Sequence, residues 1–421
     1  MGTLVSSACS SSGSNPATPV PDDHTATAAA GAASTGISSG GSSSGGSSSA
    51  AAGAIQTSSS ATGTTGSTPA TGNGAGSAQT SGGASSGDLA LDGGTGSGSA
   101  NSPPAGSGDS GSAYPNNVGD AGDGEIIVGP TYTPSPYITP QAGTPAGFET
   151  SFTMTSAMSN IYNGDDFTPP LSFSRQITVW VPSQYVDGTA SPFMVTSDGF
   201  YAGIQAVVQN LAGNADPNNS VPPLTVVGIQ NGPNVYPDSE RSLEYDTVSD
   251  RYWRFVTEEV LPAVLANTAL KAKFPNFMLT SDPNGRGGYG CSSGGPAVMG
   301  LAWFGDFNRV FSFSGSFVAI QKTTAYPEGA WEYPSLIAAA PLRPDLRVFL
   351  EVGQNDNGST LSATSDSNWV IANQDMAAAL LAKGNHYRFV YAMGAGHCDH
   401  NARNEVMPDG LVWLWRGYQA N

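Results

Sequence analysis

The chain has 421 residues, a net charge of −18 and a sequence pI of about 4.3. Such acidity argues against nucleic acid and against anionic lipid surfaces as partners. No run of about 18 apolar residues occurs, so the sequence predicts no transmembrane segment.

The amino-terminal residues 1–9 end in the letters LVSSAC, in which small residues directly precede Cys9. This resembles the last part of a bacterial lipoprotein signal with Cys9 as the lipidated residue, although the basic region and longer apolar stretch of a complete signal are missing. The start MGTLVS also fits the loose N-myristoylation pattern, and an ordinary flexible start with an incidental cysteine is the third interpretation. We therefore expect a bacterial protein outside the cytoplasm, either secreted or held at the cell surface as a lipoprotein.

The composition changes along the rest of the chain. Residues 10–125 are rich in Gly, Ser, Ala and Thr, and no Phe, Tyr or Trp occurs before Tyr114. Such a segment has too little apolar surface to offset the entropy of ordering its backbone, so we expect a disordered linker. Residues 126–145 are Pro-rich and are predicted to be extended. Residues 146–421 have a globular composition and are predicted to form one domain with a single core.

Predicted strands and helices alternate from residue 175 onward. Short apolar or β-branched runs predict strands at 175–182, 192–199, 224–230, 276–281, 309–317, 346–353 and 387–394. Apolar residues at helical spacing predict helices at 250–267, 296–305, 368–384 and 407–418. This alternation predicts an α/β fold with a mostly parallel sheet covered by helices on both faces. Ligands then bind beyond the carboxyl ends of the strands.

Residues 290–294, Gly-Cys-Ser-Ser-Gly, fit the pattern G-x-S-x-G. The pattern lies between the predicted strand 276–281 and the predicted helix 296–305, which is the context in which it marks a nucleophilic serine. Ser292 would then lie on a sharp turn, and the amino terminus of the next helix would favour negative charge beside it. In a chain rich in Ser and Gly the pattern also arises by chance, but its context favours Ser292 as a nucleophile.

A serine nucleophile needs a base, and three histidines follow the motif: His386, His397 and His400. His397 comes directly after the last predicted strand, where the carboxyl ends of the strands meet. His386 precedes that strand and so lies at the opposite edge of the sheet, and we expect His400 to be a solvated neighbour. A lone histidine in a loop is usually a surface residue, yet this position favours His397 as the base.

A carboxylate should orient the base. Asp356 comes just after the predicted strand 346–353, and the chain order Ser, Asp, His is that of α/β hydrolases. An Asp beside Asn and Gly also forms turns, which is the alternative role for Asp356. Asp366 and Asp399 are the other candidates for the acid.

Two of the three cysteines flank the proposed catalytic residues. Cys291 precedes Ser292, and Cys398 follows His397. If the serine and the histidine touch, their neighbours come within reach of a disulfide. Such a bond would clamp the nucleophile to the base and would indicate an oxidising compartment. Two buried free thiols are the alternative.

An oxyanion hole requires two backbone N–H groups. We expect Ser293, directly after the nucleophile, to supply one of them. Gly199 or Phe200, at the end of the predicted strand 192–199, is expected to supply the other. The letters SDG at this point are equally compatible with a simple turn.

The segment 318–345 lies between two predicted strands and contains Trp331 and Tyr333. Aromatic residues inserted there would form a cap that recognises sugar or aromatic groups of a substrate. Ordinary packing in the core is the alternative for both side chains.

Several stretches follow one another along residues 175–418: MVTSDG, ERSLEYD, EEVLPAV, SDPNGRGGYGCSSGG, FSFSGSF, LEVGQNDN and GAGHCDH. In this order they resemble the "putative esterase" family of α/β hydrolases, which includes esterase D, enterochelin-type siderophore esterases, feruloyl and acetylxylan esterases, and mycolyltransferases. The resemblance implies the α/β-hydrolase fold, with Ser292 as nucleophile, His397 as base and Asp356 as acid.

The arrangement Cys-Ser…Asp…His-Cys also resembles that of tannases and fungal feruloyl esterases. In those proteins a disulfide joins the neighbours of the serine and the histidine, whereas many members of the "putative esterase" family lack this pair. Arg241 and Glu244 match family positions, and the resemblance implies structural or pocket-forming roles for them.

The sequence therefore predicts a serine carboxylic ester hydrolase that works through an acyl-enzyme, without a metal or an organic cofactor. The expected substrates are carbohydrate, phenolic or siderophore esters outside the cell, either small molecules or esters linked to a polysaccharide. Two alternatives stay open. One is an acyltransferase of the same fold, in which a hydroxyl group replaces water, and the other is a catalytically inactive binding module anchored at the cell surface.

Overall fold

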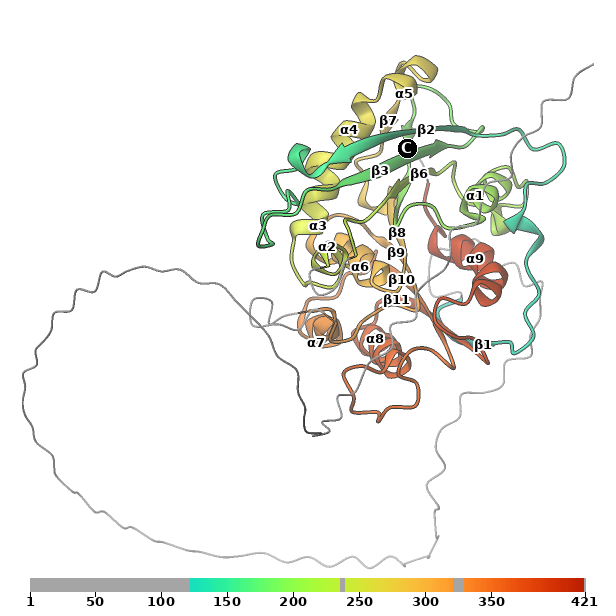
Figure 1. Ribbon diagram of the computed structural model, residues 1–421. Coiled ribbons are helices and arrows are strands. Elements are labelled where there is room, and N and C mark those ends of the chain that lie inside the picture. The colour runs from blue at the N-terminus through green and yellow to red at the C-terminus, as the bar shows by residue number, and fades with distance from the viewer. Residues whose placement is uncertain (1–121, 235–238, 321–328, 420–421) are drawn as a thin grey trace, which may run out of the picture. The chain divides into compact units, whose positions relative to one another are not determined.

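The computed structural model describes residues 122–234, 239–320 and 329–419. In these residues nine strands form one sheet, in the order β1-β11-β10-β9-β8-β5-β6-β3-β2 (Figure 1). The strands are β1 Gly124–Val128, β2 Phe148–Thr155, β3 Ser174–Val181, β5 Phe193–Ser197, β6 Thr225–Ile229, β8 Arg286–Cys291, β9 Arg309–Phe313, β10 Arg347–Gly353 and β11 His386–Ala392. β3 runs antiparallel to both of its neighbours, and every other pair in this sheet is parallel. The predicted α/β-hydrolase fold is confirmed.

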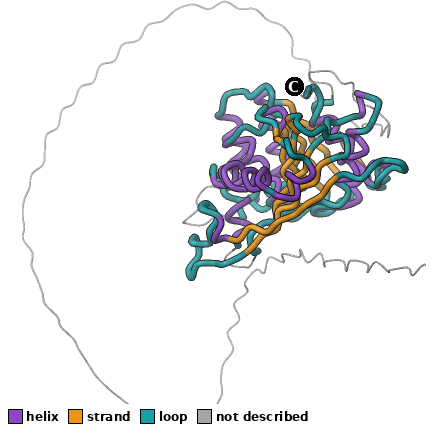
Figure 2. Tube along the Cα trace, turned by 90° about the horizontal axis from the view of Figure 1, so that it is seen from above, coloured by secondary structure: helices purple, strands orange, loops and turns teal. Residues whose placement is uncertain are grey.

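Helices cover both faces of the sheet (Figure 2). One face packs against α1 Ile204–Ala212 and α9 His400–Leu414. The other packs against α2 Glu240–Tyr245, α3 Arg251–Arg254, α4 Leu261–Ala266, α5 Thr268–Lys273, α6 Gly294–Phe304, α7 Tyr333–Ala339 and α8 Trp369–Lys383. A π-helical turn, η4 Phe255–Val260, joins α3 to α4, and short 3-10 helices lie at η1 Pro136–Ile138, η2 Ser156–Met158, η3 Pro217–Asn219, η5 Pro283–Gly285 and η6 Ala330–Glu332.

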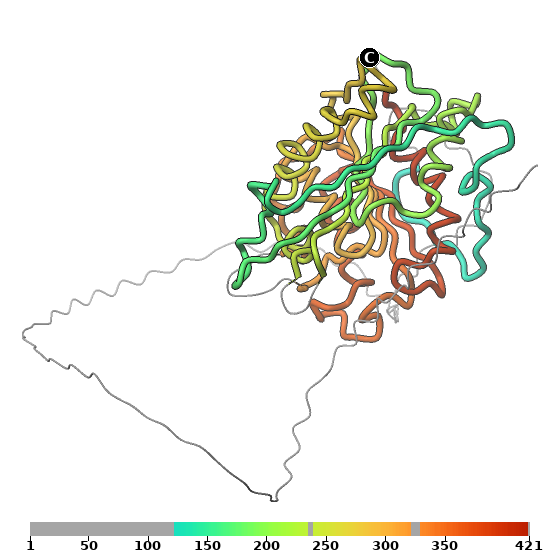
Figure 3. Tube along the Cα trace, turned by 45° about the horizontal axis from the view of Figure 1, so that its top comes forward, coloured from blue at the N-terminus to red at the C-terminus, as the bar shows by residue number. Residues whose placement is uncertain are grey.

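The central strands are buried on both faces, which explains their continuous apolar runs. All seven residues of β10 are buried. Val348 and Leu350 pack into the core on the α8 side of the sheet, while Phe349 faces the other core, against Trp413 of α9. The sheet twists from edge to edge (Figure 3). Packing on both faces fixes the carboxyl ends of the strands, where the candidate site lies.

The strand that leads to Ser292 differs from the predicted one. We expected it at 276–281, but the extended residues there are β7 Met278–Leu279, which pair with β4 Ala190–Ser191 outside the main sheet. The strand is instead β8. The sequence patterns did not predict it because it contains three glycines, and glycine is rare in strands. Packing requires these glycines, since a Cβ atom on Gly288 would lie only 2.6 Å from Cβ of Val298 in α6.

The predicted helices are present, with one difference in length. The predicted helix 250–267 corresponds to α3, η4 and α4. α8 ends at Lys383 and is followed by Gly384, whose φ of 80° is left-handed. α9 begins at His400 rather than at 407. The Asp399 side chain caps it by accepting the N–H groups of the second and third helical residues at 2.8 and 3.1 Å.

The sheet extends towards the amino terminus beyond the predicted strands. β1 pairs in parallel with β11 at one edge, so residues before 146 belong to the sheet, although we expected the folded domain to begin there. β2, which the sequence patterns did not predict, forms the other edge. Residues 1–121, with Cys9 and nearly all of the expected linker, lie outside the described residues. No helix within the described ranges is long and apolar enough to cross a membrane.

Candidate active site

Ser292 lies on the turn between β8 and α6. Its φ angle is 57°, in the left-handed region that is unusual for a residue with a side chain. Its carbonyl oxygen accepts the Gly295 N–H at 2.9 Å. A side chain at Gly290 would collide with the backbone of Gly294, and one at Gly294 would collide with Ser197 Oγ. The flanking glycines therefore allow the sharp turn that presents Ser292 at the rim of the sheet.

The three predicted catalytic side chains meet at this rim. His397, in the loop after β11, places Nε2 3.0 Å from Ser292 Oγ. Its Nδ1 lies 2.6 Å from Oδ1 of the buried Asp356, in the loop after β10. The Asn357 N–H donates to the same carboxylate oxygen at 2.7 Å. A carboxylate at Nδ1 makes that nitrogen the donor, so Nε2 accepts the hydrogen of the Ser292 hydroxyl.

The other histidines and aspartates considered above have different environments. His386 Nδ1 lies 2.6 Å from Asp123 Oδ2 at the amino end of β11, and His400 is exposed at the start of α9. Asp399 caps α9, and the exposed Asp366 lines a surface cleft. The histidine and the carboxylate that face the nucleophile are therefore the predicted pair.

Cys291 and Cys398 form a disulfide, with Cα atoms 6.2 Å apart and a sequence separation of 107 residues. The bond joins the residue before Ser292 to the residue after His397, so the structure has the predicted bridge rather than two free thiols. The Cys398 N–H also donates to Ser314 Oγ at 2.9 Å. The loop that carries the histidine is therefore attached both to β8 and to the segment after β9.

The loop after β5 lies against the nucleophile turn. The Tyr201 hydroxyl links the two by accepting the Cys291 N–H at 2.8 Å. The Gly199 N–H donates to the carbonyl of the last residue of β6 at 3.0 Å, so this predicted oxyanion donor is already engaged. The N–H groups of Phe200 and Ser293 make no hydrogen bond to another described residue. These two groups are the ones left to bind an oxyanion.

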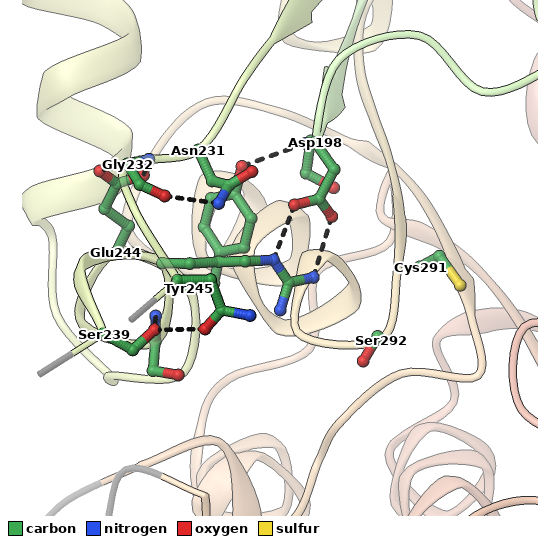
Figure 4. Close-up of polar contacts among 12 residues, drawn as sticks. Asp198, Asn231, Gly232, Ser239, Glu244, Tyr245, Cys291 and Ser292 are labelled. Atoms are coloured by element: carbon green, nitrogen blue, oxygen red, sulfur yellow. Dashed lines mark hydrogen bonds and ion pairs between the residues drawn. The ribbon is translucent and has the colours of Figure 1, made fainter. Parts of the chain in front are cut away.

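A bidentate ion pair holds the same loop. Arg241 of α2 donates to Asp198 Oδ1 through Nε at 2.7 Å and to Oδ2 through Nη2 at 3.0 Å. The Tyr245 hydroxyl accepts the Asp198 N–H at 3.1 Å, and Figure 4 shows this arrangement beside the nucleophile turn. Glu244 is buried and pairs with Arg175 at 2.6 Å. The contacts of Arg241 and Glu244 are those of structural residues, in keeping with the family resemblance.

Unusual backbone conformations gather at this rim. In the described residues, four amino acids other than glycine have a positive φ: Asp198 (58°), Ser292 (57°), Ser314 (47°) and Cys398 (50°). Each left-handed conformation of this kind costs about 1–2 kcal/mol because the Cβ atom approaches a carbonyl oxygen. All four lie in the loops that form the candidate site, where such strain is most often found.

Burial raises the pKa of several acids around the site. Burial raises the pKa of Asp246, at the carboxyl end of α2, to about 7. Burial, and then the charge of Glu244, raise the pKa of Glu240 to about 8. On β10, burial and then the charge of Asp356 raise the pKa of Glu351 well above its usual range. No group of three or more His, Cys, Asp or Glu in the described part of the chain is placed to hold a metal ion.

Asp246→Asn is expected to increase stability at alkaline pH and to leave it nearly unchanged in acid. At pH values below the ordinary aspartate pKa of about 3.9, the group is mostly protonated in both the folded and the unfolded chain. As the pH rises towards the folded pKa of about 7, the unfolded chain loses this proton first, so wild-type stability falls while that of the amide variant does not. The gain at pH 8 is at most on the order of 4 kcal/mol.

Urea unfolding of both proteins at pH 4 and pH 8 measures this gain. Asp250→Asn removes one negative charge at an exposed position and is the control. An equal difference between wild type and Asp246→Asn at the two pH values would contradict the prediction.

The two predicted substrate-binding aromatic residues have different environments. Tyr333 is 1% exposed and packs edge-on against Trp303 and Phe317. It is therefore a core residue, and a side chain so buried has no surface left for the substrate contact that we expected. Trp331 lines a surface cleft of about 290 Å³ together with Asp366.

Three polar side chains of the site were not predicted from the sequence: Tyr201 and Ser316, which touch the nucleophile turn, and Trp369, which touches Ser316. Ser316 Oγ lies 3.2 Å from Ser292 Oγ and accepts the Trp369 Nε1–H at 3.0 Å. Ser316 follows β9, and Trp369 begins α8 after β10, so both lie at the carboxyl rim of the sheet. That position was a usable signal, and Ser316 also lies in FSFSGSF, one of the stretches that carry the family resemblance.

Comparison with known proteins identifies the family of this chain. A family model described as "Putative esterase" matches residues 171–402, more than half of the chain. Similar solved structures include a ferulic acid esterase from the anaerobic fungus Anaeromyces mucronatus, with 15% identity and a TM-score of 0.48 over 68% of this chain and 96% of that chain. An enterochelin esterase from Shigella flexneri is 20% identical, with a TM-score of 0.45 over 68% of this chain and 62% of that chain. No curated protein sequence matches the chain. The chain belongs to the "Putative esterase" family and is a carboxylic ester hydrolase.

Proposed function

We propose that Ser292 is the nucleophile of this esterase, that His397 is its general base and that Asp356 orients the base. One observation carries the proposal: an unbroken hydrogen-bond chain joins Ser292 Oγ to His397 Nε2 at 3.0 Å and His397 Nδ1 to Asp356 Oδ1 at 2.6 Å. At these distances the base can take the hydroxyl proton directly.

In the first half-reaction, Ser292 Oγ attacks the ester carbonyl carbon while His397 Nε2 takes the hydroxyl proton. The carbonyl electrons move to oxygen, and the N–H groups of Ser293 and Phe200 bind the resulting oxyanion. When the oxyanion collapses, the bond to the leaving alcohol breaks and His397 returns the proton to that alcohol. In the second half-reaction, water loses a proton to His397 and attacks the acyl carbon. The bond from that carbon to Ser292 Oγ then breaks, His397 returns the proton to Oγ, and the acid is released.

Two features favour the charges that develop along this path. The buried Asp356 carboxylate, held by the Asn357 N–H at 2.7 Å, stabilises the imidazolium form of His397. The amino terminus of α6 begins two residues after Ser292, and its partial positive charge favours the oxyanion.

For the substrate we propose carbohydrate, phenolic or siderophore esters outside the cell, with Trp331 in contact with their sugar or aromatic part. We also propose that the chain is exported, that residues 10–125 are a linker and that Cys9 carries a lipid. The disulfide supports this location, because such bonds persist in oxidising compartments. A panel of these three ester classes would identify the substrate, and a free Cys9 thiol in the native protein would contradict the lipid anchor.

A fluorophosphonate probe tests the catalytic assignment, because it reacts with a serine whose base is in place. We expect one label per folded chain, on the peptide that contains Ser292, and no label on heat-denatured protein or on His397→Ala. Labelling of a different serine in an enzyme that hydrolyses esters would contradict the assignment, and an inactive binding module would not be labelled. An acyltransferase would instead give a transfer product when an alcohol is added, whereas we expect the free acid.

A further inference from the structure

Residues 314–316 follow β9 and touch both sides of the catalytic hydrogen-bond chain. Ser314 holds the loop of His397 through the Cys398 N–H, as described above. Ser316 Oγ lies 3.2 Å from Ser292 Oγ, and the Ser316 N–H donates to the Ser292 carbonyl at 3.0 Å. Ser316 is completely buried. Its hydroxyl therefore lies beside the nucleophile oxygen and is shielded from water.

His397 and Trp369 together define the hydrogen-bond directions around the two serines. Its Nε1–H lies 3.0 Å from Ser316 Oγ, and an indole nitrogen can only donate. Ser316 therefore accepts from Trp369, and because Ser292 has only one hydrogen and directs it to His397, Ser316 is the donor to Ser292 Oγ. Ser292 directs its hydrogen to His397 Nε2, and His397 donates from Nδ1 to Asp356. All the hydrogen bonds from the indole to the carboxylate thus run in one direction.

We infer that Ser316 is a further catalytic residue that donates a hydrogen bond to the nucleophile oxygen, and that Trp369 is the positioning residue that orients its hydroxyl. This inference rests on the proposed role of Ser292. When Ser292 gives its proton to His397, negative charge develops on Oγ, and the hydrogen bond from Ser316 becomes charge-assisted and stronger. When water later attacks the acyl-enzyme, the same oxygen is the leaving group and needs the same donor.

The packing around Ser316 holds this donor in place. Asn373 of α8 donates through Nδ2 to the Gly315 carbonyl at 2.8 Å, which anchors the segment. The Trp369 ring lies edge-on to the His397 ring, with centroids 5.9 Å apart. A donor that is oriented before the reaction need not reorganise while charge develops, which is how such groups accelerate a reaction.

Single and double variants test the inference by steady-state hydrolysis of p-nitrophenyl acetate. Ser316→Ala is expected to lower kcat/KM by about 10- to 100-fold, since it removes a hydrogen bond to a developing charge. Trp369→Phe keeps an aromatic ring beside His397 but lacks the N–H, and is expected to lower kcat/KM by about fivefold. In the double variant the Trp369 substitution should add less than about twofold, because the indole acts through Ser316.

Ser312→Ala is the matched control. It removes another buried hydroxyl, on β9 itself, that makes no hydrogen bond within the described residues, and its kcat/KM should stay within about twofold of wild type. Wild-type kcat/KM in Ser316→Ala would overturn the inference. The inference would also be overturned if Trp369→Phe lowered kcat/KM by the same factor in the wild-type and in the Ser316→Ala background. If Ser316→Ala fails to fold, Trp369→Phe alone tests the inference, because wild-type kcat/KM in that variant would overturn the inference.

The rate of fluorophosphonate labelling distinguishes failure of this inference from failure of the proposed function. If Ser292 is not labelled in the wild type, the nucleophile assignment is wrong. If Ser292 is labelled in the wild type and equally fast in Ser316→Ala, the nucleophile assignment stands and the role of Ser316 is wrong. We expect labelling of Ser292 in both proteins, about 10-fold slower in the variant.

Discussion

Ser292→Ala is expected to lower kcat/KM on short activated esters by about 10⁴- to 10⁶-fold. Without Oγ no acyl-enzyme forms, and the remaining rate comes from binding and from the oxyanion donors alone. His397→Ala should be about as severe, and the double variant no worse than either single one, because the residues act as a unit. Asp356→Asn should cost about 10⁴-fold, since the amide stabilises the wrong tautomer of the imidazole.

The conformation of Ser292 supplies a matched variant for this test. Because φ at this position is 57°, Ser292→Gly should be as inactive as Ser292→Ala but about 1 kcal/mol more stable, since glycine adopts this conformation without steric cost. Steady-state kinetics and thermal unfolding of both variants measure the two effects separately. Undiminished turnover by either variant would refute the nucleophile assignment, whatever its stability.

Removal of the disulfide in a Cys291→Ala/Cys398→Ala variant is expected to lower the free energy of unfolding by about 5 kcal/mol. The bond closes a loop of 107 residues, and the loss of its constraint on the unfolded chain accounts for a stabilisation of about this size. Activity should also fall, because the bond attaches the residue after His397 to the residue before Ser292. The histidine would then be held mainly by Asp356 and by the contact of its loop with Ser314.

Denaturant unfolding of the oxidised wild type, the reduced wild type and the double variant measures this contribution. The chain has three cysteines, so Cys9→Ser leaves only the bridge pair and serves as the background for counting thiols. We expect no titratable thiol in the denatured, unreduced protein. Two reactive thiols there, or equal stability of the oxidised and reduced proteins, would show that the bridge is absent in solution or contributes little.

Those parts of the fold and the site that depend on local patterns were predictable. β6 and β10 have β-branched apolar runs that only a buried strand explains. Once these strands were placed, Asp356 and His397 followed, because each comes directly after a strand and parallel strands bring their carboxyl ends to one rim. The disulfide then followed from the neighbours of the serine and the histidine.

The remaining parts depend on contacts between distant segments. β8 was missed because its glycines are selected by close packing against α6 rather than by strand propensity. The Gly199 N–H is unavailable because β6 lies beside it, and Tyr333 is buried by partners from other elements. Trp369 meets Ser316 across 53 residues of sequence, and no spacing or periodicity in the chain indicates that contact.

The four left-handed residues other than glycine at the catalytic rim have a consequence for how this enzyme would evolve. At Asp198, Ser314 and Cys398 the side chain offsets the steric cost through the Arg241 ion pair, the hydrogen bond to the Cys398 N–H and the disulfide. The Ser292 side chain instead bonds His397 and Ser316, and a glycine there would adopt the conformation more cheaply. Selection for thermal tolerance alone would therefore favour loss of this serine and of the esterase activity with it, and selection for turnover must act against that change.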